Sequence, residues 1–101
     1  MYKVDFDQME WQRPMAGVRH KILSRNNRCL RLVEYTTDMP PHWCERGHIG
    51  YMLEGEMEIQ YESDKHIYRE GDGIFIPSGG EHKHRAIILS PVAKVIFVEE
   101  T

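Results

Sequence analysis

The sequence has few of the features that mark secreted or membrane-spanning chains. It has two cysteines, Cys29 and Cys44, which we interpret as free thiols because one disulfide adds little to a chain with an adequate core in a reducing compartment. No run approaches the roughly 20 apolar residues of a membrane helix, and acidic residues interrupt the start of the chain, where a signal peptide needs an apolar segment. These absences predict a cytoplasmic protein that does not enter a membrane.

The chain also lacks a basic face or a long run of one charge. Its 13 Lys and Arg are spread through the sequence, and with 16 Asp and Glu the formal net charge is −3. A nucleic-acid-binding domain needs clustered positive charge, so neither DNA nor RNA is an expected partner. With 101 residues and 41% hydrophobic composition, the sequence predicts one folded domain with one core.

Amphipathic helical periodicity is missing, and short runs of β-branched and aromatic residues take its place. Met57, Ile59 and Tyr61 alternate with polar residues, as in a strand with one buried face. Turn-forming pairs such as Asn26-Asn27 separate the runs. We predict an all-β sandwich or barrel with strands near residues 17–24, 28–37, 48–53, 56–62, 65–70, 73–77, 82–89 and 92–99.

The two ends of the chain are interpreted separately from the barrel. Residues 1–16 form an N-terminal segment whose polar, proline-containing part is expected to lie on the surface, and residues 17–99 form the barrel. The acidic tail at residues 99–101 is expected to fray.

Histidine is over-represented, with six in the chain, and four of the six lie in two tight groups. In the first group, His42, Cys44 and His48 are separated by even offsets, which place side chains on one face of an extended segment. In the second group, His82 and His84 share a strand face by the same rule. Imidazole nitrogen and thiolate sulfur are preferred by zinc, iron, nickel and copper over magnesium and calcium, so the two groups predict a transition-metal site.

The second group lies at the end of a segment that resembles a known family. Residues 71–82, GDGIFIPSGGEH, match the second sequence motif of the cupins at each of its glycine, proline and histidine positions, and Ala86 stands where that motif ends in asparagine. The first cupin motif is met in its spacing, with altered residues: His42 takes the first histidine position, Cys44 the second, His48 the glutamate position, and Gly55 closes the motif.

The resemblance implies a cupin-type antiparallel β-barrel, also called a double-stranded β-helix or jelly roll, with one divalent metal near its centre. The implied metal ligands are His42, Cys44, His48 and His82, and the implied metal is zinc, iron, nickel or manganese. Cys44 has two interpretations, a direct ligand or a thiol that packs beside the ion.

The remaining histidines and Cys29 have weaker patterns. His84 either hydrogen-bonds a ligand or offers a general base, or it is simply packed or exposed. His20 and His66 belong to no spaced group and are left outside the predicted site. Cys29 lies in a predicted strand and is assigned to the core.

Two classes of function are compatible with this site. One is a metal-dependent enzyme that acts on a small polar or carbonyl-containing metabolite by isomerase, hydrolase, lyase or dioxygenase chemistry. The other is a non-enzymatic module that binds or senses a small molecule or the metal itself. The expected partners are a small-molecule ligand in the barrel and a second copy of the chain, with the N-terminal segment as a candidate for exchange between the copies.

Overall fold

A computed structural model describes residues 2–101, and nearly all of its regular structure is strand. The elements follow one another as η1 (Phe6–Gln8), β1 (Gln12–Met15), β2 (Val18–Arg25), β3 (Arg28–Thr36), β4 (His48–Glu54), β5 (Glu56–Tyr61), β6 (Lys65–Arg69), β7 (Gly73–Ile76), η2 (Gly80–His82), β8 (His84–Ile88) and β9 (Val92–Glu100). The predicted all-β class is confirmed, and the two helices are single 3₁₀ turns.

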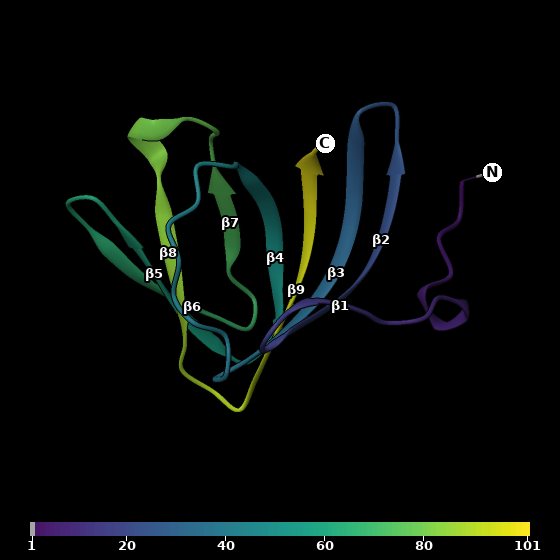
Figure 1. Ribbon diagram of the computed structural model, residues 1–101, viewed down its shortest axis with the longest axis horizontal. Coiled ribbons are helices and arrows are strands. Elements are labelled where there is room, and N and C mark those ends of the chain that lie inside the picture. Colours follow the sequence, from purple (N-terminus) through teal and green to yellow (C-terminus); the bar gives the residue numbers. More distant parts are fainter. Residues whose placement is uncertain (1) are drawn as a thin grey trace.

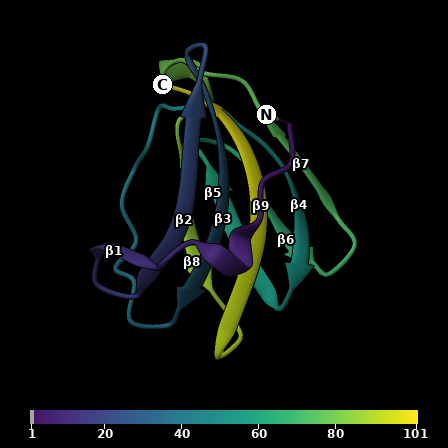
Figure 2. The ribbon, with the colours of Figure 1, turned by 90° about the vertical axis from the view of Figure 1, so that its right-hand side faces the viewer.

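Two antiparallel sheets face each other and open towards one end, as Figure 1 shows. The large sheet has the strand order β1-β2-β3-β9-β4-β7, and the small sheet has the order β6-β5-β8. Figure 2 shows β9, the last strand, running between β3 and β4 in the large sheet. This arrangement is the predicted jelly-roll barrel.

The bounds of the predicted strands agree with the observed ones to within one residue, with one exception. The interval 82–89 was expected to be strand throughout, but residues 80–82 form the 3₁₀ turn η2 and β8 begins at His84. His82 and His84 therefore do not share a strand face. In addition, residues 12–15, in the N-terminal segment proposed for exchange between copies, form β1, an edge strand that pairs with β2 of the same chain.

Local sequence explains two of the turns. Asn26 and Asn27 both have positive φ, 53° and 64°, as a two-residue hairpin turn of the primed type requires, and β2 pairs with β3 up to Arg25 opposite Arg28. Gly55 has a φ of 82° where the chain leaves β4 in the large sheet and enters β5 in the small one. A Cβ at Gly55 would collide with the backbone of Val92, so glycine is required there.

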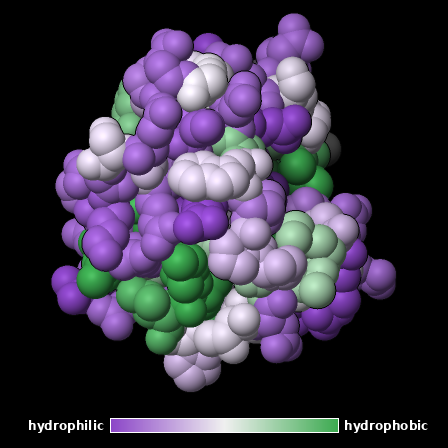
Figure 3. Space-filling view, turned by 60° about the vertical axis from the view of Figure 1, so that its left-hand side comes forward, coloured by the Kyte–Doolittle hydropathy of each residue, from purple (hydrophilic) through white to green (hydrophobic). Residues whose placement is uncertain are grey.

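The core lies between the sheets and is built from the inward side chains of both. Met52, Met57, Val33 and Val95 are the largest fully buried side chains. The opposite face of the small sheet meets solvent: Figure 3 shows that most of this side of the molecule is hydrophilic. The strict alternation that predicted β5 is therefore confirmed, with Met57 and Ile59 buried.

The N-terminal segment folds back on the large sheet of its own chain. The Trp11 ring packs against the Arg19 guanidinium, 4.1 Å from the ring centroid, and against the Lys21 ammonium at 4.7 Å. The Lys21 ammonium also donates a hydrogen bond of 2.6 Å to the Phe6 carbonyl. None of the helices in residues 2–101 is long and apolar enough to cross a membrane.

Candidate metal centre

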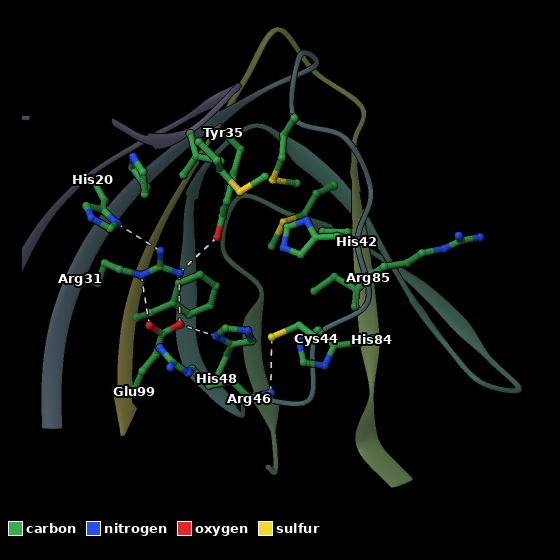
Figure 4. A pocket seen from close by; sticks show the side chains of 18 of the residues that line it. His20, Arg31, Tyr35, His42, Cys44, Arg46, His48, His84, Arg85 and Glu99 are labelled. Atoms are coloured by element: carbon green, nitrogen blue, oxygen red, sulfur yellow. Dashed lines mark hydrogen bonds and ion pairs between the residues drawn. The ribbon is translucent and has the colours of Figure 1, made fainter. Parts of the chain in front are cut away.

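A cavity of about 610 Å³ lies between the two sheets. Strands β2, β3, β4 and β9 of the large sheet, β5 and β8 of the small sheet, and the loop before β4 all contribute to its lining. Figure 4 shows polar side chains gathered on both sides of this space. A cavity of this size and mixed character suits a small-molecule ligand.

Three potential metal ligands converge on one side of the cavity. Cys44, His48 and His84 each offer one ligand atom, and these atoms lie within 4.8 Å of one another. We call these three residues the sulfur–histidine cluster. They come from the loop before β4, the first residue of β4 and the first residue of β8, so the cluster spans both sheets.

Backbone pairing explains why Cys44 lies beside His84. The two residues form an antiparallel bridge, in which the Cys44 amide donates to the His84 carbonyl at 2.8 Å and the His84 amide donates to the Cys44 carbonyl at 2.9 Å. The bridge fixes the loop that carries Cys44 against the start of β8. The amide of Arg46 also donates to the Cys44 sulfur at 3.4 Å, which holds the sulfur in place.

Hydrogen bonds to Nδ1 fix the tautomers of both histidines in the cluster. His84 Nδ1 lies 3.0 Å from the His82 carbonyl oxygen, which only accepts, so Nδ1 carries the proton. His48 Nδ1 contacts the Glu99 carboxylate, which also accepts. In the neutral form of both rings Nε2 is therefore the nitrogen with the lone pair, the state in which a histidine binds a metal.

His84 Nε2 provides a direct test of whether a metal fits. Among residues 2–101, Nε2 of His84 is a buried side-chain atom with no hydrogen-bond partner, and an unsatisfied buried polar atom costs about 1–3 kcal/mol. Burial, opposed by the His82 carbonyl and assisted by His48 and His42, lowers the pKa of His84 and keeps the ring neutral. A neutral imidazole with a buried free lone pair beside a thiol and a second imidazole fits a soft or borderline divalent metal.

The Glu99 carboxylate contacts His48 on the side of the ring away from Nε2. Glu99 is 4% exposed, and its carboxylate accepts from His48 and forms an ion pair with Arg31, with Nε of Arg31 at 3.1 Å. Burial alone would raise the pKa of Glu99, but the His48 hydrogen bond and the Arg31 charge hold it below its ordinary value. The result is an ionised carboxylate that orients a histidine of the cluster, as outer-shell groups do in metal sites.

The structure separates the sequence-predicted ligands into two sets. It brings Cys44 and His48 together, and His84 joins them. His42 lines the same cavity, with its Nδ1 3.2 Å from the Pro40 carbonyl, so in the neutral ring Nε2 is the nitrogen with the lone pair. His82 lies in η2 outside the cluster, with a side chain that is 41% exposed and 3.8 Å from Glu81.

Glu99 and Arg31 were missed by the sequence analysis. The expectation that residues 99–101 fray is wrong for Glu99, because β9 continues to Glu100. In this strand Glu99 lies opposite Cys29, and Glu100 lies opposite Arg28. A signal was available: Ala93, Val95 and Phe97 alternate inwards, so the next residue of that parity, Glu99, also points into the barrel.

The other residues weighed from the sequence have clear places. His20 lines the cavity and contacts Arg31, although it was left outside the predicted site. His66 is exposed and pairs with Asp64 at 3.0 Å. Cys29 is buried, as expected of a core residue, and burial together with the charge of Glu99 raises its pKa.

Comparison with known proteins gives the family. A family model described as a cupin domain matches residues 29–98, and the chain therefore belongs to the cupin family. KdgF from Halomonas sp. is 26% identical, with a TM-score of 0.76, and the match covers 93% of this chain and 89% of KdgF. The sequence matches none of the curated proteins.

Two further solved structures share the fold at lower identity. An RmlC-like cupin from Shewanella frigidimarina is 16% identical with a TM-score of 0.77, and the match covers 99% of this chain and 90% of that one. The polyketide cyclase RemF from Streptomyces resistomycificus is 22% identical with a TM-score of 0.77, and the match covers 99% of this chain and 79% of RemF. The jelly-roll fold is thus shared by proteins with different names, and the site decides the function.

Proposed function

We propose that this cupin binds one divalent transition metal through Cys44, His48 and His84, and uses it as an enzyme acting on a small polar or carbonyl-containing metabolite. The observation that carries the proposal is the convergence of one sulfur and two imidazoles whose Nδ1 atoms already have partners. The buried, unpartnered Nε2 of His84 supports it, because a metal ion would satisfy that atom.

The ligand atoms narrow the choice of metal. One sulfur and two nitrogens favour zinc, iron or nickel over magnesium and calcium, with manganese as a harder alternative. His42 is the proposed fourth ligand, since it lines the same cavity and its Nε2 is free to bind. The ligand set drawn from the motif, with His82 in place of His84, is the competing proposal, and it requires η2 to rearrange.

The chemistry follows from a site with an open position. A divalent metal that keeps one position open beside its protein ligands would supply a Lewis acid that polarises a carbonyl or lowers the pKa of bound water. The chain's own residues do the rest: Glu99 orients His48, the bridge between Cys44 and His84 holds the loop, and the two sheets enclose the ligand.

Metal content tests the proposal directly. Protein prepared without chelator is expected to carry about one divalent metal per chain by elemental analysis. His48→Ala is expected to lose most of it, whereas His66→Ala, which removes an exposed histidine outside the cavity, is expected to keep it. Wild-type protein that contains no metal, and gains none when zinc, iron, nickel or manganese is offered, contradicts the proposal.

Turnover separates the enzyme from a binding module. The metal-loaded protein, incubated with a panel of small hydroxy- and oxo-acids, is expected to convert at least one of them, with products followed by NMR. A compound that binds only the metal-loaded protein and is recovered unchanged supports the alternative, a cupin that binds or senses a ligand without reaction.

A homodimer is the proposed assembly. Phe75 is 76% exposed, and its cross-strand neighbour Ile49 and the next neighbour Val98 are 48% and 42% exposed on the outer face of the large sheet. Such a row of apolar side chains is typical of a protein interface. Light scattering is expected to give twice the chain mass, and Phe75→Lys to halve it. A monomer mass for wild-type protein at micromolar concentration contradicts the assembly.

A further inference from the structure

The cavity has a second polar wall opposite the sulfur–histidine cluster. Arg31 and Tyr35, both on β3, line the cavity, and an NH2 group of Arg31 donates to the Tyr35 hydroxyl oxygen at 3.4 Å. Figure 4 shows the Tyr35 hydroxyl pointing into the space between Arg31 and the cluster. We call Arg31 and Tyr35 the donor wall.

The donor wall offers protons, because the direction of each hydrogen bond is fixed. A guanidinium only donates, so His20 Nδ1, which lies 3.3 Å from an Arg31 nitrogen, accepts, and the Tyr35 oxygen accepts as well. The Tyr35 hydroxyl proton is therefore left over. Within residues 2–101 no acceptor contacts it, and the hydroxyl faces the cavity, so the proton is available to a ligand there.

The opposite wall has the reverse character. His48 and His84 present lone pairs at Nε2, and Cys44 presents sulfur, so that side of the cavity attracts a cation. A ligand held between the two walls must bind a metal with one of its atoms and accept a hydrogen bond from Tyr35 with another. Oxygen atoms of a carboxylate, carbonyl or hydroxyl group satisfy both requirements.

Charge indicates the sign of the ligand. Arg31 and Glu99 form an ion pair at 3.1 Å and cancel one another. The lining also includes Arg46, Arg85 and Glu45, so its three arginines and two glutamates leave one positive charge, to which a bound divalent metal would add. An anionic ligand neutralises this excess of positive charge.

We propose that the cavity binds a small anionic hydroxy- or oxo-carboxylate, with its oxygen atoms on the metal and a hydrogen bond from the Tyr35 hydroxyl. The proposal rests on the proposed metal-dependent function and adds its ligand class. Burial raises the pKa of Tyr35 in spite of the Arg31 charge, so the phenol stays protonated as this role requires.

Cobalt-loaded protein provides the test, with lactate as the probe and lactamide as its uncharged counterpart. The cobalt absorption spectrum is expected to change on titration with lactate, and lactamide to bind at least about 10-fold more weakly. Tyr35→Phe is expected to keep the cobalt and to weaken lactate binding about 3- to 10-fold, as for loss of one hydrogen bond. Tyr61→Phe is the matched control, because it also removes one hydroxyl. The Tyr61 hydroxyl forms a hydrogen bond of 2.6 Å with the Tyr68 hydroxyl, and neither residue lines the cavity.

The outcomes separate this inference from the function beneath it. Cobalt bound with unchanged lactate affinity in Tyr35→Phe, or equal affinity for lactate and lactamide, overturns the ligand class and leaves the metal site standing. Failure of the wild-type protein to bind cobalt, zinc or any other offered metal overturns the proposed function, and the ligand class with it.

Discussion

Replacing Glu99 by Gln removes one charge from the support of His48 and leaves the shape of the side chain almost unchanged. The Glu99 side chain is 3% exposed and the Arg31 side chain 15%, so the pair is shielded from water. The glutamine oxygen can still accept from one partner, but the charge that neutralises Arg31 and polarises His48 is gone.

The magnitude has two parts. Loss of one partner of a buried ion pair costs about 3–5 kcal/mol, and the remaining amide acceptor places Glu99→Gln near the lower figure, about 3 kcal/mol of unfolding free energy. Loss of an outer-shell carboxylate typically weakens metal binding by about 10- to 100-fold. Both effects are expected in one variant because both partners meet at one carboxylate.

The assay is a zinc titration of metal-free protein against a competing chelator, at a temperature where each variant is fully folded by circular dichroism. Glu34→Gln is the matched control. Glu34 lies on β3, which pairs with the strand that carries Glu99, and its carboxylate forms an ion pair with Arg19 at 2.8 Å. Glu34 does not line the cavity. Its zinc affinity is expected to stay within about twofold of wild type. Equal zinc affinities for Glu99→Gln and Glu34→Gln refute the assignment of Glu99 as the residue that positions His48.

Further predictions concern single residues. His84→Ala is expected to lose the bound metal and His82→Ala to keep it, measured by elemental analysis; the reverse result supports the ligand set drawn from the motif. Cobalt-loaded protein is expected to show an intense thiolate charge-transfer band that disappears in Cys44→Ser and persists in Cys29→Ser, and a band unaffected by Cys44→Ser means that this thiol only packs beside the ion. Burial and the Tyr68 hydroxyl raise the pKa of Tyr61, so the stability it contributes is complete below about pH 10 and is lost as the pH rises through the folded-state pKa. Tyr61→Phe is expected to flatten that alkaline decline in denaturant titrations, and an identical decline in both proteins contradicts it.

Alternation and turn chemistry made most of the fold predictable. Asn26-Asn27 can adopt positive φ at low cost, so the hairpin between β2 and β3 follows from two residues. Met57 and Ile59 alternate with polar residues, so their burial follows from the two-residue period of a strand. These signals are local, and the sequence carries them in full.

The site was less predictable because its details depend on irregular backbone. His82 and His84 share a parity, but the 3₁₀ turn at residues 80–82 removes His82 from the strand, and counting residues does not show where a turn ends. For Glu99 the sequence carries two conflicting signals. Its alternation with Ala93, Val95 and Phe97 predicts an inward side chain, whereas an acidic residue near a chain end suggests exposure. The charge of Glu99 is neutralised by Arg31, which lies two residues before the buried Val33 on β3 and therefore points to the same face of the sheet.

The position of the sulfur–histidine cluster between the two sheets also affects the stability of the barrel. His48 begins a strand of the large sheet and His84 begins a strand of the small one, so an ion shared by them would join the two halves of the barrel at its open end. Metal affinity would then appear as resistance to unfolding, by about 2.7 kcal/mol when free metal exceeds its dissociation constant 100-fold. In such a molecule a chelator acts as a denaturant, and the melting temperature reports the metal supply of the surroundings.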